Sequence, residues 1–222
     1  MKTVAVIPAY NESEVVAEVV TLTLAQVDTV LVVDDCSHDG TALRAREAGA
    51  QIVRHRLQRG AGRATATGLM AAMQLGAELV VTLDADGQHL PEEIPTVLEP
   101  VRAGEADIVV GCRSIKRSDM PALRRAGNRF ANYWTWLLTG VAVSDSQSGF
   151  RAYTREAVEK LPLEARGYEF CSHTLGEAAH LGLRIKEVPI TVVYTEYSQS
   201  KGQGFWTSVH TLSKIAKEGL RS

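Results

Sequence analysis

Oxygen-bearing side chains follow the apolar run at 79–83. Asp84, Asp86 and Gln88 stand at alternating positions, and the alternation of a strand would project the two carboxylates to the same side. Carboxylate and amide oxygens suit Mg²⁺ or Mn²⁺, and a set this incomplete leaves room for substrate phosphates. We therefore predict a divalent metal site, the alternative being two solvated acids in a turn. His89 follows directly, and we expect it to support the site or to pack rather than to bind the metal.

A second group of carboxylates, Asp34, Asp35 and Asp39, follows the apolar run at 29–33. Like charges this close repel one another, so the arrangement requires a compensating interaction. Asp39 is predicted to be the N-cap of a helix that begins at Thr41. Ending a strand does not require two adjacent acids, so we expect at least one of Asp34 and Asp35 to bind a ligand.

A run of basic residues lies at 113–129, where six cations accompany one acid for a local charge of +5. The aromatic residues Phe130, Tyr133, Trp134 and Trp136 follow it. This combination suits the surface of an anionic membrane, the alternatives being a solvated helix face and tryptophans in the core. The charged residues are Arg113, Lys116, Arg117, Arg124, Arg125 and Arg129, with Asp119 as the acid.

Short apolar runs alternate with longer amphipathic stretches over residues 1–112. The runs are mostly continuous Val, Ile and Leu, as in strands buried on both faces. This alternation predicts a mostly parallel sheet with helices on both faces, in which ligands bind beyond the carboxyl ends of the strands. The predicted strands are 4–8, 29–33, 51–53, 79–83 and 108–110, and the predicted helices are 13–24, 41–48, 62–75 and 91–102.

The pattern changes after Cys112 to a shorter α+β portion. We predict strands at 148–153 and 184–194 and a helix at 168–180. The polar segment 195–204 contains Lys201 among glycines and serines, a composition that suits a mobile lid, although a plain connector is the alternative. The chain ends in an amphipathic helix, 205–220, whose apolar stripe we expect to pack on the core or in a homodimer.

Composition excludes several classes of protein. Hydrophobic residues make up 45% and charged residues 23% of the 222, which argues against disorder. The 24 basic and 26 acidic side chains leave a charge of -2, so no nucleic-acid partner is expected. The three cysteines are far apart and form no CxxC, which favours reduced cytoplasm. No segment resembles a signal peptide or reaches the roughly 18 apolar residues of a membrane span.

Two common nucleotide-binding motifs are missing after the first strand. Residues 8–12 read Pro-Ala-Tyr-Asn-Glu, where a dinucleotide-binding domain would have GxGxxG and a P-loop protein GxxxxGKS/T. The later segment 60–63, Gly-Ala-Gly-Arg, lacks the final glycine of the first motif. A nucleotide site in this chain is therefore expected to use another pattern.

Four segments, in this order and spacing, resemble family 2 glycosyltransferases of the glycosyltransferase A fold. Within that family they are most similar to the dolichyl-phosphate mannosyltransferase and polyprenyl-phosphate glycosyltransferase branch. The likeness runs from Val4 to about Lys201, and it implies one domain, 1–222, with a nucleotide-sugar-binding half (1–112) and an acceptor-side half (113–222). The segments are Pro8-Ala9-Tyr10-Asn11-Glu12, Asp34-Asp35-Cys36-Ser37-His38-Asp39-Gly40-Thr41, Asp84-Ala85-Asp86-Gly87-Gln88-His89 and Ser148-Gly149-Phe150-Arg151.

The resemblance implies roles for these residues. Asp86 and Gln88 would hold Mg²⁺ or Mn²⁺, and Asp84 and Ala85 would lie at the sugar nucleotide. Two departures matter. The family usually has a basic residue between the glycines of 60–62, but this chain has Ala61, so Arg59 or Arg63 would take over its contacts. The family's usual Phe-x-x-Glu reads Phe170-Cys171-Ser172-His173 here, without the glutamate. The nucleotide contacts implied are Pro8, Ala9, Tyr10, Glu12, Asp34, Asp35 and Arg63, and those implied or expected for the acceptor phosphate are Arg113, Arg125, Arg129, Ser148, Gly149 and Lys201.

The implied reaction is an inverting displacement at the anomeric carbon of a nucleotide sugar, GDP-mannose or a UDP-hexose. A lipid-phosphate acceptor such as polyprenyl or dolichyl phosphate is already anionic and mainly requires cations that position it. A hydroxyl acceptor requires a base, for which Asp145, Glu169 and His173 are the candidates. A sugar-1-phosphate nucleotidyltransferase and a non-catalytic nucleotide-sugar-binding protein are the rival classes. For a glycosyltransferase with a lipid-phosphate acceptor, we expect a cytoplasmic enzyme that is peripheral on the membrane.

Overall fold

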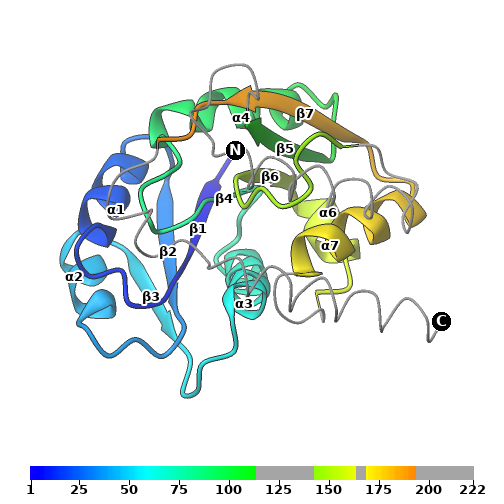
Figure 1. Ribbon diagram of the computed structural model, residues 1–222. Coiled ribbons are helices and arrows are strands. Elements are labelled where there is room, and N and C mark those ends of the chain that lie inside the picture. The colour runs from blue at the N-terminus through cyan, green and yellow to red at the C-terminus, as the bar shows by residue number, and fades with distance from the viewer. Residues whose placement is uncertain (114–142, 164–168, 194–222) are drawn as a thin grey trace, which may run out of the picture.

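Seven strands form one mixed sheet in the computed structural model, which describes residues 1–113, 143–163 and 169–193 (Figure 1). The strand order is β3-β2-β1-β4-β6-β5-β7, and only β6 runs antiparallel to its neighbours. The strands are β1 (Thr3–Ala9), β2 (Thr29–Asp34), β3 (Gln51–Arg54), β4 (Leu79–Thr82), β5 (Ile108–Arg113), β6 (Arg151–Thr154) and β7 (Ile185–Ile190).

Helices cover both faces of this sheet, as the alternation of side chains along β1 shows. Ala5 and Ile7 face a core that contains residues of α1, α2 and α4, whereas Val4 and Val6 face a core that contains residues of α3, α6 and α7 (Figure 1). Apolar residues are therefore buried on both sides, which explains the continuous apolar runs of the sequence. The helices are α1 (Val16–Leu24), α2 (Thr41–Glu47), α3 (Ala61–Gln74), a 3₁₀ turn η1 (Pro91–Glu93), α4 (Ile94–Arg102), α6 (Arg155–Lys160) and α7 (Glu169–His180).

Local signals fix the helix ends, with one correction. Gly49 and Gly76 follow the last turns of α2 and α3 with φ of 102° and 77°, a left-handed conformation that favours glycine. Asp39, however, is not the N-cap of α2: that position belongs to Gly40, whose φ is 88°. Asp39 lies one residue earlier, and its carboxylate accepts a hydrogen bond from the Thr41 N–H (3.1 Å).

The strand order creates a switch point between β1 and β4. From β1 the chain continues to β2 and β3 on one side, whereas β4 pairs with β1 on the other side. Loops that leave the carboxyl ends of β1, β2 and β4 therefore diverge at this edge, where ligands bind in open α/β sheets. These loops carry the segments 8–12, 34–41 and 84–89 that the sequence singles out.

The predicted α/β architecture is confirmed, with differences in detail. β6 inserts between β4 and β5, so strands from both halves of the chain share one sheet. The short helix α6 was not predicted, and Pro91–Glu93 forms a 3₁₀ turn rather than the first turn of α4. None of the described helices is both long and apolar enough to cross a membrane. The segments predicted as lid (195–204) and last helix (205–220) lie outside the described residues.

Candidate active site

Hydrogen bonds join the loop after β1 to the loop after β2. The Asn11 N–H donates to Ser37 Oγ (2.9 Å), and Asn11 Oδ1 accepts from the His38 N–H (3.0 Å). The Glu12 N–H donates to Thr41 Oγ1 (2.8 Å). Asn11 has a φ of 55°, a left-handed conformation that is uncommon for residues other than glycine and that these contacts stabilise. The two loops thus form one wall at the switch point.

The predicted nucleotide residues line this wall in different ways. Pro8 and Ala9 are the last residues of β1, and Ala9 is buried beside its β2 partner Asp34. Tyr10 is 38% exposed, so its ring is available to a ligand, and Glu12 is half-buried. The structure therefore brings these residues to one edge, and their contacts with a nucleotide remain a prediction.

The adjacent acids Asp34 and Asp35 both have partners within the protein. Asp34 is fully buried, its Oδ1 accepts from the Ser37 N–H (3.1 Å), and its Oδ2 lies 2.9 Å from Arg54 Nε. Asp35 is also buried and accepts hydrogen bonds from the segment 55–60. These bonds compensate the repulsion between the two carboxylates, and each acid organises a loop around the expected nucleotide site.

Asp84 and Gly149 touch, although 65 residues separate them in the chain. A Cβ atom on Gly149 would lie 2.5 Å from Asp84 Oδ1, a distance that side chains do not tolerate. Thr82 Oγ1 donates to the Gly149 carbonyl (2.6 Å) and fixes the glycine in this place. A side chain at this position would displace the Asp84 carboxylate, so glycine lets the loop before β6 approach the carboxylate where it lies, and Ser148 is carried with it. The close approach was not predicted from sequence, although the glycine of the fourth segment was its signal.

Asp86 and Gln88 lie in a turn after β4, not on an extended strand. β4 ends at Thr82, so the expected strand alternation does not reach these residues: Asp84 is 49% exposed, while Asp86 is mostly buried. Asp86 Oδ1 accepts from the Gln88 N–H (3.0 Å), and Oδ2 accepts from Gln88 Nε2 (2.6 Å). Burial and, after it, the charge of Asp84 raise the pKa of Asp86. The two carboxylates are therefore close enough to repel each other.

This donor set fits a hard divalent cation. A cation held by Asp86 would favour its charged form against the burial and the Asp84 charge that raise its pKa, and Gln88 adds an amide to the same turn. Among the described residues, no cluster of three or more His, Cys, Asp or Glu side chains could hold a metal unaided. Mg²⁺ and Mn²⁺ sites of this kind are commonly completed by substrate phosphates.

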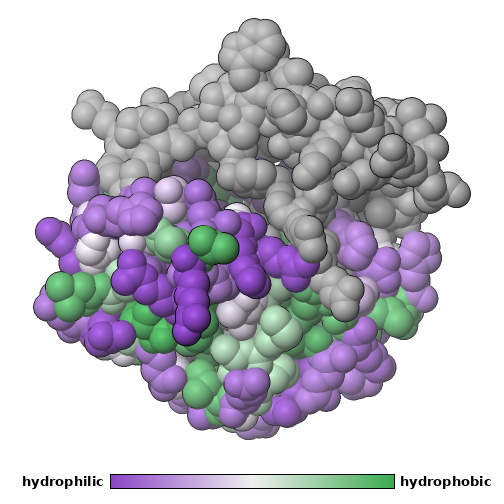
Figure 2. Space-filling model, turned by 90° about the horizontal axis from the view of Figure 1, so that it is seen from below, coloured by the Kyte–Doolittle hydropathy of each residue, from purple (hydrophilic) through white to green (hydrophobic). Residues whose placement is uncertain are grey.

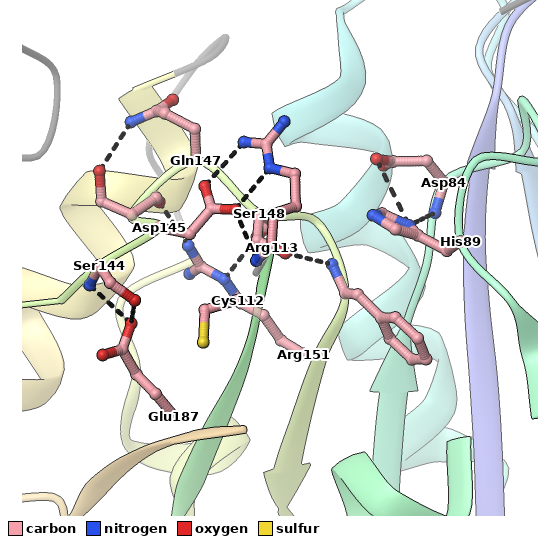
Figure 3. A network of polar contacts seen from close by, with 12 residues as sticks. Asp84, His89, Cys112, Arg113, Ser144, Asp145, Gln147, Ser148, Arg151 and Glu187 are labelled. Carbon is pink, nitrogen blue, oxygen red and sulfur yellow. Dashed lines mark hydrogen bonds and ion pairs between the residues drawn. The ribbon is translucent and has the colours of Figure 1, made fainter. Parts of the chain in front are cut away.

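His89 supports the loop and packs in the core. Its Nδ1 accepts a hydrogen bond from the Asp84 N–H (3.2 Å), and its ring lies 5.2 Å from the ring of Phe150 (Figure 3). The Nδ1 lone pair is therefore engaged by the backbone and is not available to a metal. This geometry agrees with the supporting role that we expected for His89.

Asp145 and Arg113 form a bidentate ion pair on the other side of the site (Figure 3). Arg113 Nε lies 2.5 Å from Asp145 Oδ2, and Nη2 lies 2.7 Å from Oδ1. Asp145 is buried at 3% exposure, whereas the Arg113 side chain keeps 23%. Both oxygens of the predicted base candidate are thus bound to a guanidinium, which orients Arg113 at the carboxyl end of β5.

Arg151 anchors the loop that carries Ser148 and Gly149, a role that was not predicted. Its guanidinium is buried and donates to three carbonyls: Nε to Ser148 (2.9 Å), Nη2 to Ser146 (2.7 Å) and Nη1 to Cys171 (2.9 Å). The loop and the first turn of α7 are thereby fixed to β6 (Figure 3). The arginine of the fourth segment is consequently structural, and it sets where Gly149 meets Asp84.

The helix α7 supplies no described carboxylate to the site in place of the usual Phe-x-x-Glu. Burial raises the pKa of the Cys171 thiol, Ser172 Oγ accepts from Gln147 Nε2 (2.6 Å), and exposed His173 lies 3.7 Å from Glu177. The side chain of the third base candidate, Glu169, is not described. The acceptor-side residues Arg125, Arg129 and Lys201 also lie outside the described residues, whereas Arg63 is half-buried in the first turn of α3.

Residues 4–162 match the model of Glycosyl transferase family 2. The chain belongs to this family. Two relatives of family 2 are named for lipid-phosphate acceptors. The UDP-N-acetylglucosamine–dolichyl-phosphate N-acetylglucosaminyltransferase of Methanococcus voltae is 38% identical, and the alignment covers 89% of this chain and 88% of that protein. The undecaprenyl-phosphate mannosyltransferase of Micrococcus luteus is 36% identical over 92% of this chain and 88% of that protein.

Solved structures show the same fold. Glucosyl-3-phosphoglycerate synthase from Mycobacterium tuberculosis, crystallised with Mn²⁺, UDP and glucosyl-3-phosphoglycerate, superposes with a TM-score of 0.72 at 23% identity and covers 96% of this chain and 79% of that one. The glycosyltransferase A type of fold expected from the sequence is thus confirmed. As a member of family 2, the chain is a glycosyltransferase, which sets aside the nucleotidyltransferase and non-catalytic readings.

Proposed function

We propose that this glycosyltransferase moves a sugar from a nucleotide sugar, GDP-mannose or a UDP-hexose, to the phosphate of a polyprenyl or dolichyl phosphate. Mg²⁺ or Mn²⁺ at Asp86 and Gln88 would assist the reaction. The names of the relatives from Methanococcus voltae and Micrococcus luteus support this acceptor class. A solved neighbour crystallised with Mn²⁺ and UDP supports the metal and the donor class.

The observation that carries the proposal is the Arg113–Asp145 ion pair. A hydroxyl acceptor would require a free base beside the donor, and of the base candidates Asp145 has both oxygens bound to the Arg113 guanidinium, whereas His173 lies 3.7 Å from Glu177. A phosphate acceptor is anionic near neutral pH and requires a cation that positions it. Arg113, oriented by Asp145 and partly exposed, meets that requirement.

The chemistry is a single displacement. An oxygen of the acceptor phosphate bonds to the anomeric carbon while the bond from that carbon to the nucleoside diphosphate breaks, so the anomeric centre inverts and no proton transfer is needed. Negative charge grows on the leaving diphosphate, and a divalent cation, when bound, would offset it by several kcal/mol. Asp86 and Gln88 would hold this cation, Asp84 would contact the sugar, and Arg113 would orient the attacking phosphate.

Location on a membrane follows from the acceptor. A polyprenyl phosphate exposes only its head group to water, so the enzyme must meet it at the bilayer surface. The carboxyl end of β5 lies at the same edge as Asp84 and Asp86, and the basic and aromatic residues of 113–138, which follow it in the sequence, suit an anionic bilayer. We therefore propose a peripheral enzyme on the cytoplasmic face of the membrane.

Transfer assays test the proposal. The protein would be incubated with Mn²⁺, radiolabelled UDP-N-acetylglucosamine or GDP-mannose, and undecaprenyl phosphate in detergent. We expect label in the lipid phase with one donor, and none when the metal is chelated. Label transferred only to phosphoglyceric acid or another soluble hydroxyl compound would contradict the lipid-phosphate acceptor.

A further inference from the structure

Asp35, His55 and Thr67 form a buried chain of hydrogen bonds. His55 Nδ1 lies 2.7 Å from Asp35 Oδ1, and His55 Nε2 lies 3.0 Å from Thr67 Oγ1. The side chains of Asp35 and His55 are only 3% and 8% exposed. Because a carboxylate without a proton only accepts, Nδ1 carries the hydrogen of the first bond. The imidazole is held from both sides, and it links the end of β2 to the middle of α3.

The same carboxylate fixes the β3–α3 loop, residues 55–60. The Arg59 N–H donates to both oxygens of Asp35 (2.9 and 3.1 Å), and the Gly60 N–H donates to Oδ2 (2.7 Å). Gly60 is the N-cap of α3, with φ 88° and ψ 160°, a conformation that is essentially limited to glycine. Asp35 therefore holds the end of this loop and the start of α3 in one arrangement.

The arrangement presents cations at the edge of the sheet where the nucleotide is expected. The loop lies at the bottom of Figure 1, and Figure 2, seen from below, shows mainly hydrophilic residues over the described part of that face. Arg59 is exposed, and Arg63 lies in the first turn of α3. Neither guanidinium has a carboxylate partner within the described ranges, and the segment 51–77 contains no Asp or Glu. Both side chains are thus available to a diphosphate.

We propose that His55 is a positioning residue for the nucleotide sugar, an inference that rests on the proposed function. Its Nδ1–H holds the Asp35 carboxylate in the orientation that closes the β3–α3 loop, and the closed loop keeps Arg59 and Arg63 in place for the diphosphate. His55 acts through Asp35 and does not touch the reacting atoms. Its loss weakens donor binding and leaves the displacement step intact.

Three substitutions of His55 distinguish the role of Nδ1 from the role of Nε2. His55→Asn places an amide N–H near the position of Nδ1 and keeps the bond to Asp35. His55→Gln reaches toward Thr67 instead, and His55→Leu makes neither bond. With Mn²⁺ and the better bound of UDP-N-acetylglucosamine and GDP-mannose, we expect the donor KM and Kd to rise about tenfold in the Leu and Gln variants and at most about twofold in the Asn variant. The kcat at saturating donor stays within about twofold of wild type.

Amide hydrogen exchange, measured without nucleotide sugar, tests whether His55 holds the β3–α3 loop. In the Leu variant the amides of Arg59 and Gly60 exchange faster than in wild type, and the Asn variant restores their protection. Thr67→Val is the matched control, because it removes the bond to Nε2 and leaves the bond to Asp35. It is expected to keep wild-type donor affinity.

Two results overturn the inference: wild-type donor affinity in His55→Leu, or equal losses of kcat, donor affinity and melting temperature in the Leu and Asn variants. If the wild type binds no nucleotide sugar, the proposed function fails instead. In that case the exchange rates of Arg59 and Gly60 still decide whether His55 holds the loop.

Discussion

At the scale of single residues, the site depends on the absence of a side chain at Gly149 and on the interaction between the carboxylates of Asp84 and Asp86. Gly149 lets the acceptor-side loop reach Asp84, and Thr82 and Arg151 hold it there. Asp86 lies in the turn after β4, where its own burial and, after it, the charge of Asp84 raise its pKa. The Gly149–Asp84 contact and the Asp84–Asp86 pair each lead to a prediction.

Gly149→Ala is predicted to lower the transfer rate at least about tenfold. The new methyl group would be 2.5 Å from Asp84 Oδ1, so the half-exposed carboxylate must leave its place beside the loop, with little change in the free energy of unfolding. Gly104→Ala is the control. An added side chain there is strained by the φ of +68° but meets no neighbouring atom. Transfer rates and urea unfolding would be measured for both. Equal activity of the two variants would disprove the role of the Gly149 contact.

Asp86→Asn is predicted to lower transfer about 100-fold or more without loss of stability, since metal-assisted charge neutralisation contributes several kcal/mol. Burial and Asp84 raise the folded-state pKa of Asp86. A carboxyl with a raised pKa disfavours the folded state as the pH rises above its unfolded pKa, so the neutral amide leaves the melting temperature at pH 7 unchanged or higher. Asp107→Asn, in an ion pair with Arg184 away from the site, is the control. Metal-independent transfer by Asp86→Asn at the wild-type rate would refute the metal assignment.

At the scale of elements, the loops after β1 and β2 depend on hydrogen bonds from the start of α2. Asp39 Oδ2 accepts from the Ser13 N–H (3.1 Å), and Oδ1 accepts from Thr41. Burial alone would raise the pKa of Asp39, but these bonds outweigh it and lower the pKa to about 2. Asp39, one residue before the N-cap, thus joins the loop after β1 to the loop after β2.

Asp39→Asn is therefore predicted to reduce stability in a pH-dependent way. The folded pKa lies below the ordinary value of 3.8, so the carboxylate stabilises the fold above about pH 4 and loses this contribution as the pH falls toward 2. Because Asp39 is exposed, solvent screening limits the difference to about 1 kcal/mol at pH 7. Urea unfolding of both proteins between pH 7 and pH 2.5 measures it. A difference that stays constant over this range would argue against an ionised Asp39.

The sequence was most informative where the signal is local. Continuous apolar runs predicted the parallel strands, because burial on both faces leaves a direct trace in composition. It also singled out the segments 8–12, 34–41 and 84–89, which do meet at one edge.

Long-range pairing was not predictable from such signals. Nothing local in 148–154 shows that β6 inserts between β4 and β5, antiparallel to both. The ion pair of Arg113 with Asp145, the contact of Gly149 with Asp84 and the bonds of Asp35 with the 55–60 loop all join residues far apart in sequence. Their side chains were recognised as candidates, but their partners depend on the folded topology.

At the scale of the whole molecule, one edge of the sheet is where we expect both substrates to bind. The donor-side loops leave β1, β2, β3 and β4, and the acceptor side leaves β5 and enters β6. A lipid acceptor would reach this edge from a bilayer, so we expect the basic surface around it to bind anionic membranes.

Liposome flotation tests this membrane contact. We predict that the protein floats with anionic vesicles at low salt and that an Arg124/Arg125/Arg129 triple alanine variant does not, since each basic residue near such a surface contributes about 1 kcal/mol. A triple alanine variant at Arg44, Arg46 and Arg102, which are exposed in α2 and α4, removes the same charge elsewhere and should still float. Flotation should weaken as salt increases. Equal flotation of the two variants would show that the basic run is not the contact.

The central claim, transfer to a lipid phosphate, is tested most directly by the mass of the product formed when both acceptor classes compete. Undecaprenyl phosphate and phosphoglyceric acid would be offered together with Mn²⁺ and a mixture of UDP-N-acetylglucosamine and GDP-mannose. The bidentate Arg113–Asp145 pair leads us to expect a single glycosyl-phosphoryl lipid as the product. A glycosylated phosphoglyceric acid with no glycosylated lipid would contradict the account.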